Sequence, residues 1–114
     1  MDKGLGKRLF EFAIHVIKFT RDFPNTKEYE IIKNQLIKSA TSSGANYEEA
    51  QGASSRAYFV NKIKIALREM RESNYWMRII IEISQKSNES SFLLNESTEL
   101  MNILGSISSK AATK

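Results

Sequence analysis

Bulky apolar residues recur at three- and four-residue spacing along most of the chain, the period of a helix face that packs on a core. Proline at position 24 ends the first such segment, because it pushes Phe23 out of the helical conformation. Gly52 and the polar run from Ser87 to Ser90 mark two further breaks. The predicted helices cover about residues 5–23, 26–51, 55–87 and 91–108, and a frayed tail covers residues 109–114. Short connections between four amphipathic helices predict an all-α fold, an antiparallel up-down-up-down four-helix bundle formed as a single domain by residues 1–114.

The second predicted helix contains an unbroken run of small residues from Ser39 to Ala45. Small side chains let the ridges of one helix sit deep in the grooves of the next, so the two backbones come close. Ser39 and Ser43 share one face of this helix, four residues apart. We therefore expect the closest helix crossing of the bundle along this run.

Composition narrows the class of protein. The chain has 114 residues, of which 41% are apolar and 26% charged, which is typical of one globular domain. It has no cysteine, so disulfides and thiolate metal sites are excluded. No apolar run is long enough to span a bilayer or to form a signal peptide. These features favour a cytoplasmic protein that does not contact the membrane.

The residues do not form a recognisable catalytic or metal-binding set. His15 is the single histidine and is expected to be solvated on the first helix. Glu48 and Glu49 are adjacent, so on a helix they point about 100° apart and cannot act as a facing pair. Glu49 is expected instead to join Asn46 and Glu72 in a polar cluster that fixes helix register, and a general acid or base is the alternative. We expect no enzyme activity and no cofactor.

Basic residues line the outer side of the long third helix, opposite its core-facing positions. They fall within about 80° of one another, and no acid interrupts them before Glu82. Arginine suits phosphate because its planar fork donates two hydrogen bonds at once, and an aromatic ring among the cations can stack on an unpaired base. A plain solvated face is the alternative. The predicted nucleic-acid-binding residues, here called the basic row, are Lys64, Arg68, Arg71, Tyr75 and Arg78.

Two further apolar lines lie away from the predicted core faces. The first helix carries Phe10, Ile14 and Ile17, and the third carries Tyr58, Ile65, Trp76, Ile79 and Ile83. A monomeric bundle would leave much of this surface in water, and large exposed apolar patches are uncommon. Either the fourth helix covers the second line, or the protein associates with itself. A protein-binding scaffold that receives a partner helix is also compatible with these faces.

The segment from Asn46 to Gly52, followed by Ser54-Ser55-Arg56, resembles the four-helix-bundle family encoded by intervening sequences in bacterial 23S rRNA genes. Phe23-Pro24 and the segment from Gln35 to Ala40 fit the same pattern. The resemblance implies an up-down bundle that assembles as a homopentamer. One branch of the family is the accessory protein of diversity-generating retroelements, a basic barrel that contacts nucleic acid and a reverse transcriptase.

Residues and resemblance together predict a non-enzymatic, oligomeric four-helix-bundle protein. Its expected partners are copies of itself, RNA or DNA bound through the basic row, and a reverse transcriptase. The alternative is a protein-binding scaffold that makes no contact with nucleic acid.

Overall fold

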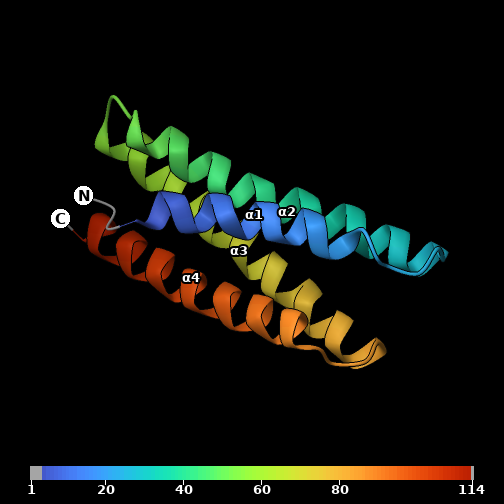
Figure 1. The fold of residues 1–114 in the computed structure, drawn as a ribbon. Helices are drawn as coiled ribbons and strands as arrows, with labels where there is room; N and C mark the ends of the chain where they lie inside the picture. The colour runs from blue at the N-terminus through green and yellow to red at the C-terminus, as the bar shows by residue number, and fades with distance from the viewer. Residues whose placement is uncertain (1–3, 114) are drawn as a thin grey trace.

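The computed structural model describes residues 4–113, which form four helices joined by short turns. The helices are α1 (Leu5–Thr20), α2 (Lys27–Gln51), α3 (Arg56–Ile83) and α4 (Asn88–Ala112). Each helix packs against its neighbour in sequence, and α4 returns beside α1 to close the bundle, as Figure 1 shows. The bundle measures 46 × 21 × 20 Å. The predicted all-α four-helix bundle is confirmed.

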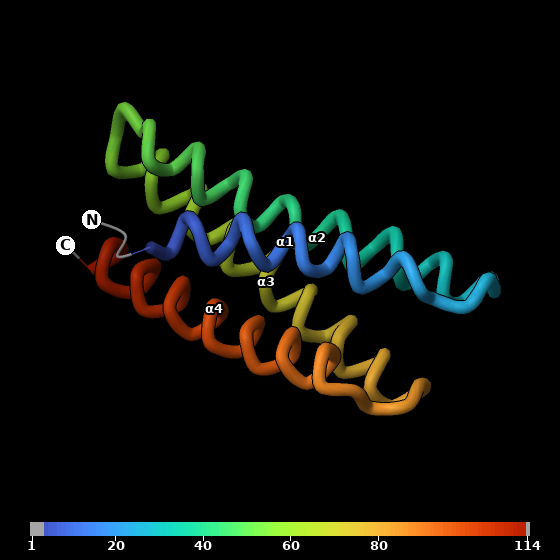
Figure 2. The backbone as a smooth tube through the Cα atoms, viewed as in Figure 1, coloured from blue at the N-terminus to red at the C-terminus, as the bar shows by residue number. Residues whose placement is uncertain are grey.

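The tube in Figure 2 shows that α2 and α3 meet at the end of the bundle where α1 starts and α4 finishes. The α1–α2 and α3–α4 turns lie at the opposite end. The contact between α1 and α4 is the least extensive of the four helix pairs. The two halves of the bundle are therefore joined mainly through α2 and α3.

The first helix ends at Thr20, three residues before the predicted end at Phe23. Residues 21–23 leave the helix in a tight turn, in which the Phe23 amide donates to the Thr20 carbonyl at 3.2 Å. The Phe23 ring then packs edge-on against Phe19 and Tyr29, with ring centroids 5.4 and 5.1 Å apart. Phe23 thus joins α1 to α2 instead of extending α1.

The α3–α4 turn lies earlier in the chain than predicted, because α3 ends at Ile83 rather than near residue 87 and α4 begins at Asn88 rather than near residue 91. Ser87 and Ser90 form a reciprocal cap: the Ser87 hydroxyl accepts from the Ser90 amide at 3.0 Å, and the Ser90 hydroxyl accepts from the Ser87 amide at 2.9 Å. This cap starts α4 within the serine-rich segment. The loop that we predicted from its polar composition is therefore largely helical.

The prediction of a frayed tail at residues 109–114 is also wrong for residues 109–112, because α4 continues to Ala112. Arg56, in the first turn of α3, donates two hydrogen bonds to the Ala111 carbonyl, at 3.1 Å from Nε and 2.7 Å from Nη2. Arg56 thereby places a positive charge at the C-terminal end of α4, where the helix dipole favours a cation. Lys114 lies outside the described residues.

The small-residue run of α2 makes the close crossing that the sequence predicts. Fully buried Ser39 lies with its hydroxyl 2.7 Å from the hydroxyl of Ser73 on α3. Ser43, also fully buried, donates to the backbone carbonyl of Ala66 on α3 at 2.8 Å. A side chain can bond a neighbouring helix's carbonyl directly only where the two backbones lie close together.

The same small-residue run also packs against α1, through Gly44. A Cβ atom at Gly44 would lie 3.6 Å from both the Cβ and the carbonyl oxygen of Leu9 on α1, which is ordinary van der Waals contact. The α1 backbone therefore rests directly on the α2 backbone at this point. The small residues let α2 pack closely on α1 and α3 together.

A larger side chain at Ser39 should disturb this packing. We expect Ser39→Leu to lower the free energy of unfolding by about 1–3 kcal/mol, because the buried site has no room for the added carbons. Thr41→Leu is the matched control: Thr41 is exposed and its hydroxyl bonds only within α2, so the change should stay within about 0.5 kcal/mol. Urea unfolding measures both, and equal stability of the two variants would contradict the close α2–α3 contact.

Candidate nucleic-acid interface

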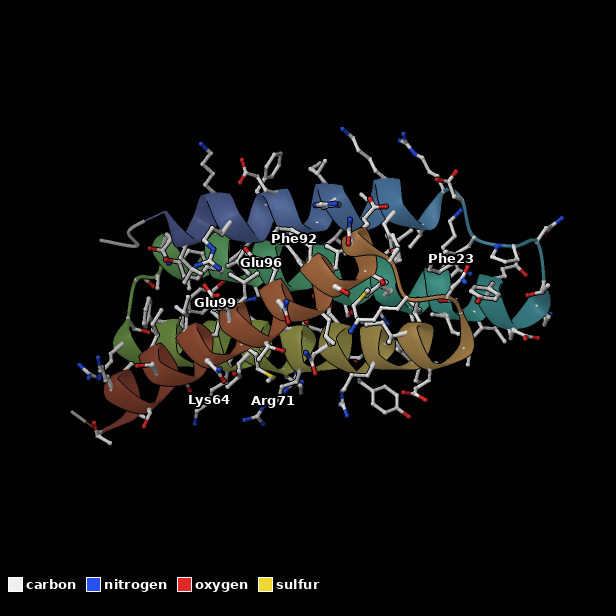
Figure 3. All side chains as sticks on the ribbon, turned by 60° about the horizontal axis from the view of Figure 1, so that its bottom comes forward. Phe23, Lys64, Arg71, Phe92, Glu96 and Glu99 are labelled. Atoms are coloured by element: carbon white, nitrogen blue, oxygen red, sulfur yellow. The ribbon has the colours of Figure 1, made fainter. Side chains whose placement is uncertain are left out.

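All five residues of the basic row lie on the exposed outer side of α3. The opposite side of the helix carries its fully buried core residues, among them Ile63, Met70 and Met77. The row spans fifteen residues, from Lys64 to Arg78, or about 21 Å along the helix. Figure 3 shows the side chains of Lys64 and Arg71 pointing away from the bundle. The sequence prediction thus placed these residues on the correct side of the helix.

The charges of the basic row are not neutralised by other parts of the fold. Within residues 4–113, no carboxylate lies at ion-pair distance from Lys64, Arg68, Arg71 or Arg78. By contrast, Arg8 and Lys62 lie close to glutamates. The basic row therefore presents four cations that have no carboxylate partner among the described residues.

One arginine of the row is held in place by a buried amide that the sequence analysis missed. Arg78 donates from Nε to the Asn74 side-chain oxygen at 3.2 Å, and the Asn74 amide nitrogen donates to the hydroxyls of Ser97 and Thr98 on α4, each at 3.0 Å. The Arg78 guanidinium also lies over the Tyr75 ring, 5.6 Å from its centroid. Asn74 thereby links the basic row to α4.

The acids of α4 all face away from the basic row. Arg8 of α1 binds Glu96 with two hydrogen bonds, at 3.0 Å from Nε and 2.8 Å from Nη2, and Nη2 also binds Glu99 at 2.8 Å. These hydrogen bonds, first of all those to Glu96, raise the pKa of Arg8. His15 lies 3.3 Å from Glu89 at the same α1–α4 contact. In Figure 3, Glu96 and Glu99 lie between α1 and α4.

On its other side the basic row is bounded by acids. Lys62, which bonds Glu49 of α2 at 2.6 Å, marks the side of α3 that faces α2. Glu69 and Glu72 fall on this side by helical spacing and are half-buried. The electropositive surface of α3 is therefore a single row, one helix wide.

The family model for the 23S rRNA-intervening sequence protein matches residues 5–106. The chain belongs to this family. A crystal structure of a member of the S23 ribosomal protein family from Bacteroides thetaiotaomicron VPI-5482, a protein of unknown function, is 33% identical in sequence and superposes with a TM-score of 0.82. The match covers 91% of this chain and 97% of that one. No curated protein matches the sequence.

In this member of the 23S rRNA-intervening sequence protein family, the predicted cluster of Glu49, Asn46 and Glu72 does not form. Glu49 pairs with Lys62, and Asn46 donates to the Ser42 carbonyl within its own helix at 2.9 Å. Glu72 instead accepts from the indole nitrogen of Trp76 at 3.2 Å. Antiparallel packing separates Glu72 from Glu49 by several helical turns. The register of α2 and α3 is fixed by buried serines instead.

His15 also differs from its prediction. It is half-buried rather than solvated, and its ring stacks on Phe92 of α4 at a centroid distance of 5.2 Å. Together with the Glu89 contact, this places the single histidine in the α1–α4 contact. Within residues 4–113, no three histidine or acidic side chains are grouped as metal ligands.

The second apolar line of α3 lies on the α2 side of the helix, so the idea that α4 covers it is wrong. Trp76 and Ile79 are half-buried and pack against the core. Tyr58 and Ile83 remain 42% and 49% exposed. The fold therefore buries the middle of this line and leaves its ends in solvent.

Another apolar surface lies between α1 and α2. It is a groove of about 490 Å³, and Gly44 and Ala45 line its α2 side. On the α1 side, Phe10 is 66% exposed and Ile14 is 38% exposed. None of the helices within residues 4–113 has the length and hydropathy to cross a membrane. The groove thus leaves apolar side chains of α1 open to solvent.

The Arg8 contact should stabilise the α1–α4 pair measurably. We expect Arg8→Met to lower the free energy of unfolding by about 1–2 kcal/mol, because Glu96, whose side chain is only 17% exposed, would lose both of its hydrogen bonds. Lys7→Met removes an adjacent exposed charge and should change stability by less than about 0.5 kcal/mol. Denaturant unfolding compares the two variants. An unchanged free energy of unfolding in Arg8→Met would show that the Arg8 contact does not stabilise the fold.

Proposed function

We propose that this protein is a non-enzymatic nucleic-acid-binding protein of the cytoplasm, whose basic row contacts the sugar–phosphate backbone of RNA or DNA. The observation that carries the proposal is the exposure of four cations along about 21 Å of α3, without an ion-pair partner among the described residues. The acids of α4 do not offset this charge, because Arg8 and His15 hold them on the side of α4 that faces α1.

Binding through this surface follows from phosphate chemistry. Each arginine can donate two parallel hydrogen bonds to one phosphate, and Lys64 adds a point charge. The row lies on the flank of a long helix packed into a bundle, so it presents no projecting element to enter a groove and read base edges. Affinity should therefore depend little on sequence. With four phosphate contacts per protomer, the slope of log K against log salt concentration should be about −3.

We further propose that the protein is a homo-oligomer, and a homopentamer as the family resemblance implies. The apolar groove between α1 and α2, with Phe10 exposed at its edge, supports association. A symmetric ring would repeat the basic row in every protomer. Repetition would give a phosphate-binding surface of high charge to a chain whose own formal charge is only +4.

The same groove favours a second candidate function, a protein-binding scaffold. A partner helix with an apolar face could fill the groove without any contribution from the basic row. A reverse transcriptase, implied by the family resemblance, would be a partner of this kind. In that case, substitutions in the basic row would leave complex formation unchanged, whereas Phe10→Glu would prevent it.

Charge reversal tests the nucleic-acid proposal directly. We expect Arg68→Glu with Arg71→Glu to lower affinity for RNA and DNA by more than about tenfold at moderate salt, because two phosphate contacts become repulsive. Arg21→Glu with Lys27→Glu is the matched control, since it makes the same change in net charge at exposed positions at the two ends of the α1–α2 turn, outside the groove. Fluorescence anisotropy with a labelled oligonucleotide measures both variants, and circular dichroism checks their helicity.

Equal affinity of the two double mutants would contradict the proposal. If both bound as tightly as the wild type, the basic row would be a solvated face. If both lost affinity equally, total charge rather than the basic row would determine binding.

Light scattering tests assembly. The wild type should have several times the 13.0 kDa mass of the chain, and Phe10→Glu should shift it towards the monomer because a charge at the groove opposes apolar contact. Unchanged helicity of this variant would separate loss of assembly from loss of folding. A wild type that is monomeric at micromolar concentration would contradict the oligomer and its repeated basic surface.

A further inference from the structure

A second row of exposed polar residues lies on α4, next to the basic row of α3. Thr98 marks its position, because it accepts a hydrogen bond from Asn74 across the α3–α4 contact. The other members follow at three- and four-residue spacing, so they share one side of α4. This α4 polar row consists of Asn95, Thr98, Asn102, Ser106 and Ser109, all exposed and all uncharged.

The two rows run side by side in opposite directions. Asn74 meets Ser97 and Thr98, and Arg56 meets Ala111, which fixes the antiparallel register of α3 and α4. Each row spans fifteen residues, about 21 Å, and packed helix axes are separated by about 8–10 Å. Together they form one surface that is cationic along one side and rich in amides and hydroxyls along the other.

In one protomer, this surface offers phosphate-binding charge for only one strand. A duplex presents two sugar–phosphate backbones on either side of each groove, and both attract cations. On the α4 side of the basic row the neighbouring side chains are neutral, and on the α2 side they include Glu69 and Glu72. A second backbone would therefore face either uncharged groups or carboxylates.

Tyr75 adds a group that a duplex cannot use. Its ring is 49% exposed and lies between Arg71 and Arg78 in the row, with the Arg78 guanidinium over it and Trp76 edge-on at 5.4 Å. An exposed aromatic ring among phosphate-binding cations is the arrangement that stacks unpaired bases in single-strand-binding proteins. In a duplex the bases are already stacked on one another and are not available to a ring on a helix surface.

We propose that the α3–α4 surface binds single-stranded nucleic acid: the basic row follows the backbone, Tyr75 stacks one base, and the α4 polar row hydrogen-bonds the neighbouring base edges or sugars. This inference rests on the proposed nucleic-acid-binding function and specifies the class of ligand. The side-chain amides of Asn95 and Asn102 can both donate and accept, so they suit any base, whereas cations there would favour phosphate alone. The source can be RNA or DNA, because stacking and backbone charge are common to both.

The experiment measures the affinity of one labelled strand alone and of the same strand annealed to its complement, as RNA and as DNA, with the wild type and two Tyr75 variants. We expect the single strand to bind several-fold more tightly than the duplex. Tyr75→Ala should lower single-strand affinity about tenfold and change duplex affinity little. Tyr75→Phe should bind the single strand like the wild type, since stacking needs the ring and not the hydroxyl.

Each result has a distinct meaning. Duplex binding equal to or tighter than single-strand binding would overturn this inference and leave the proposed function standing. Loss of affinity in Tyr75→Phe equal to that in Tyr75→Ala would also overturn it, because the hydroxyl would then be bonding a phosphate. Failure of the wild type to bind either form would overturn both the inference and the proposed function.

Discussion

Two buried hydroxyl contacts determine how α3 is oriented in the bundle. Ser39 meets Ser73, and Ser43 bonds the Ala66 carbonyl, both in sites that exclude water. A buried hydroxyl without a partner is costly, so rotation or sliding of α3 against α2 is opposed at both positions. With α3 held in this register, its core residues point inward and the basic row points outward. The exposed cations are thus a consequence of the interior packing.

The α1–α4 contact keeps the negative charge of α4 away from the basic row. Arg8 gathers Glu96 and Glu99, and His15 lies against Glu89, so the negative charge of α4 is held on the side of the bundle away from the basic row. Beyond Glu99 the sequence contains no acid. Because the acids of α4 face α1, the surface over α3 and α4 carries only positive and uncharged polar side chains along the two rows. Membership of the 23S rRNA-intervening sequence protein family accounts for the bundle, and the charge distribution is a property of this chain's own residues.

The sequence predicted the bundle, its helix order and the outward direction of the basic row, because these follow from periodicity within single helices. Helix ends were less predictable: the serine cap at Ser87 and the Arg56 contact with Ala111 depend on neighbours that a hydrophobic pattern does not show. The roles of Asn74 and Arg8 could not be predicted either. Their partners on other helices lie 23 or more residues away in sequence, and only the packing of helices brings them together.

The predicted cluster of Glu49, Asn46 and Glu72 does not form, for a related reason. Residues on antiparallel helices meet only when their distances from the connecting turn match, and Glu72 lies much farther from the α2–α3 turn than Glu49 does. Lys62 is at the matching position and forms the ion pair. Gly52 marks the turn in the sequence, and its position places Glu72 too far along α3 to meet Glu49.

Photo-cross-linking of the wild type to a single-stranded oligonucleotide that carries thiouridine, followed by mass spectrometry of the peptides, tests most directly whether the α3–α4 surface is the nucleic-acid interface. Adducts should concentrate on residues 64–78 of α3, with Tyr75 the main site, and on residues 95–109 of α4. Adducts on the α1–α2 groove, or spread evenly over all four helices, would contradict the account.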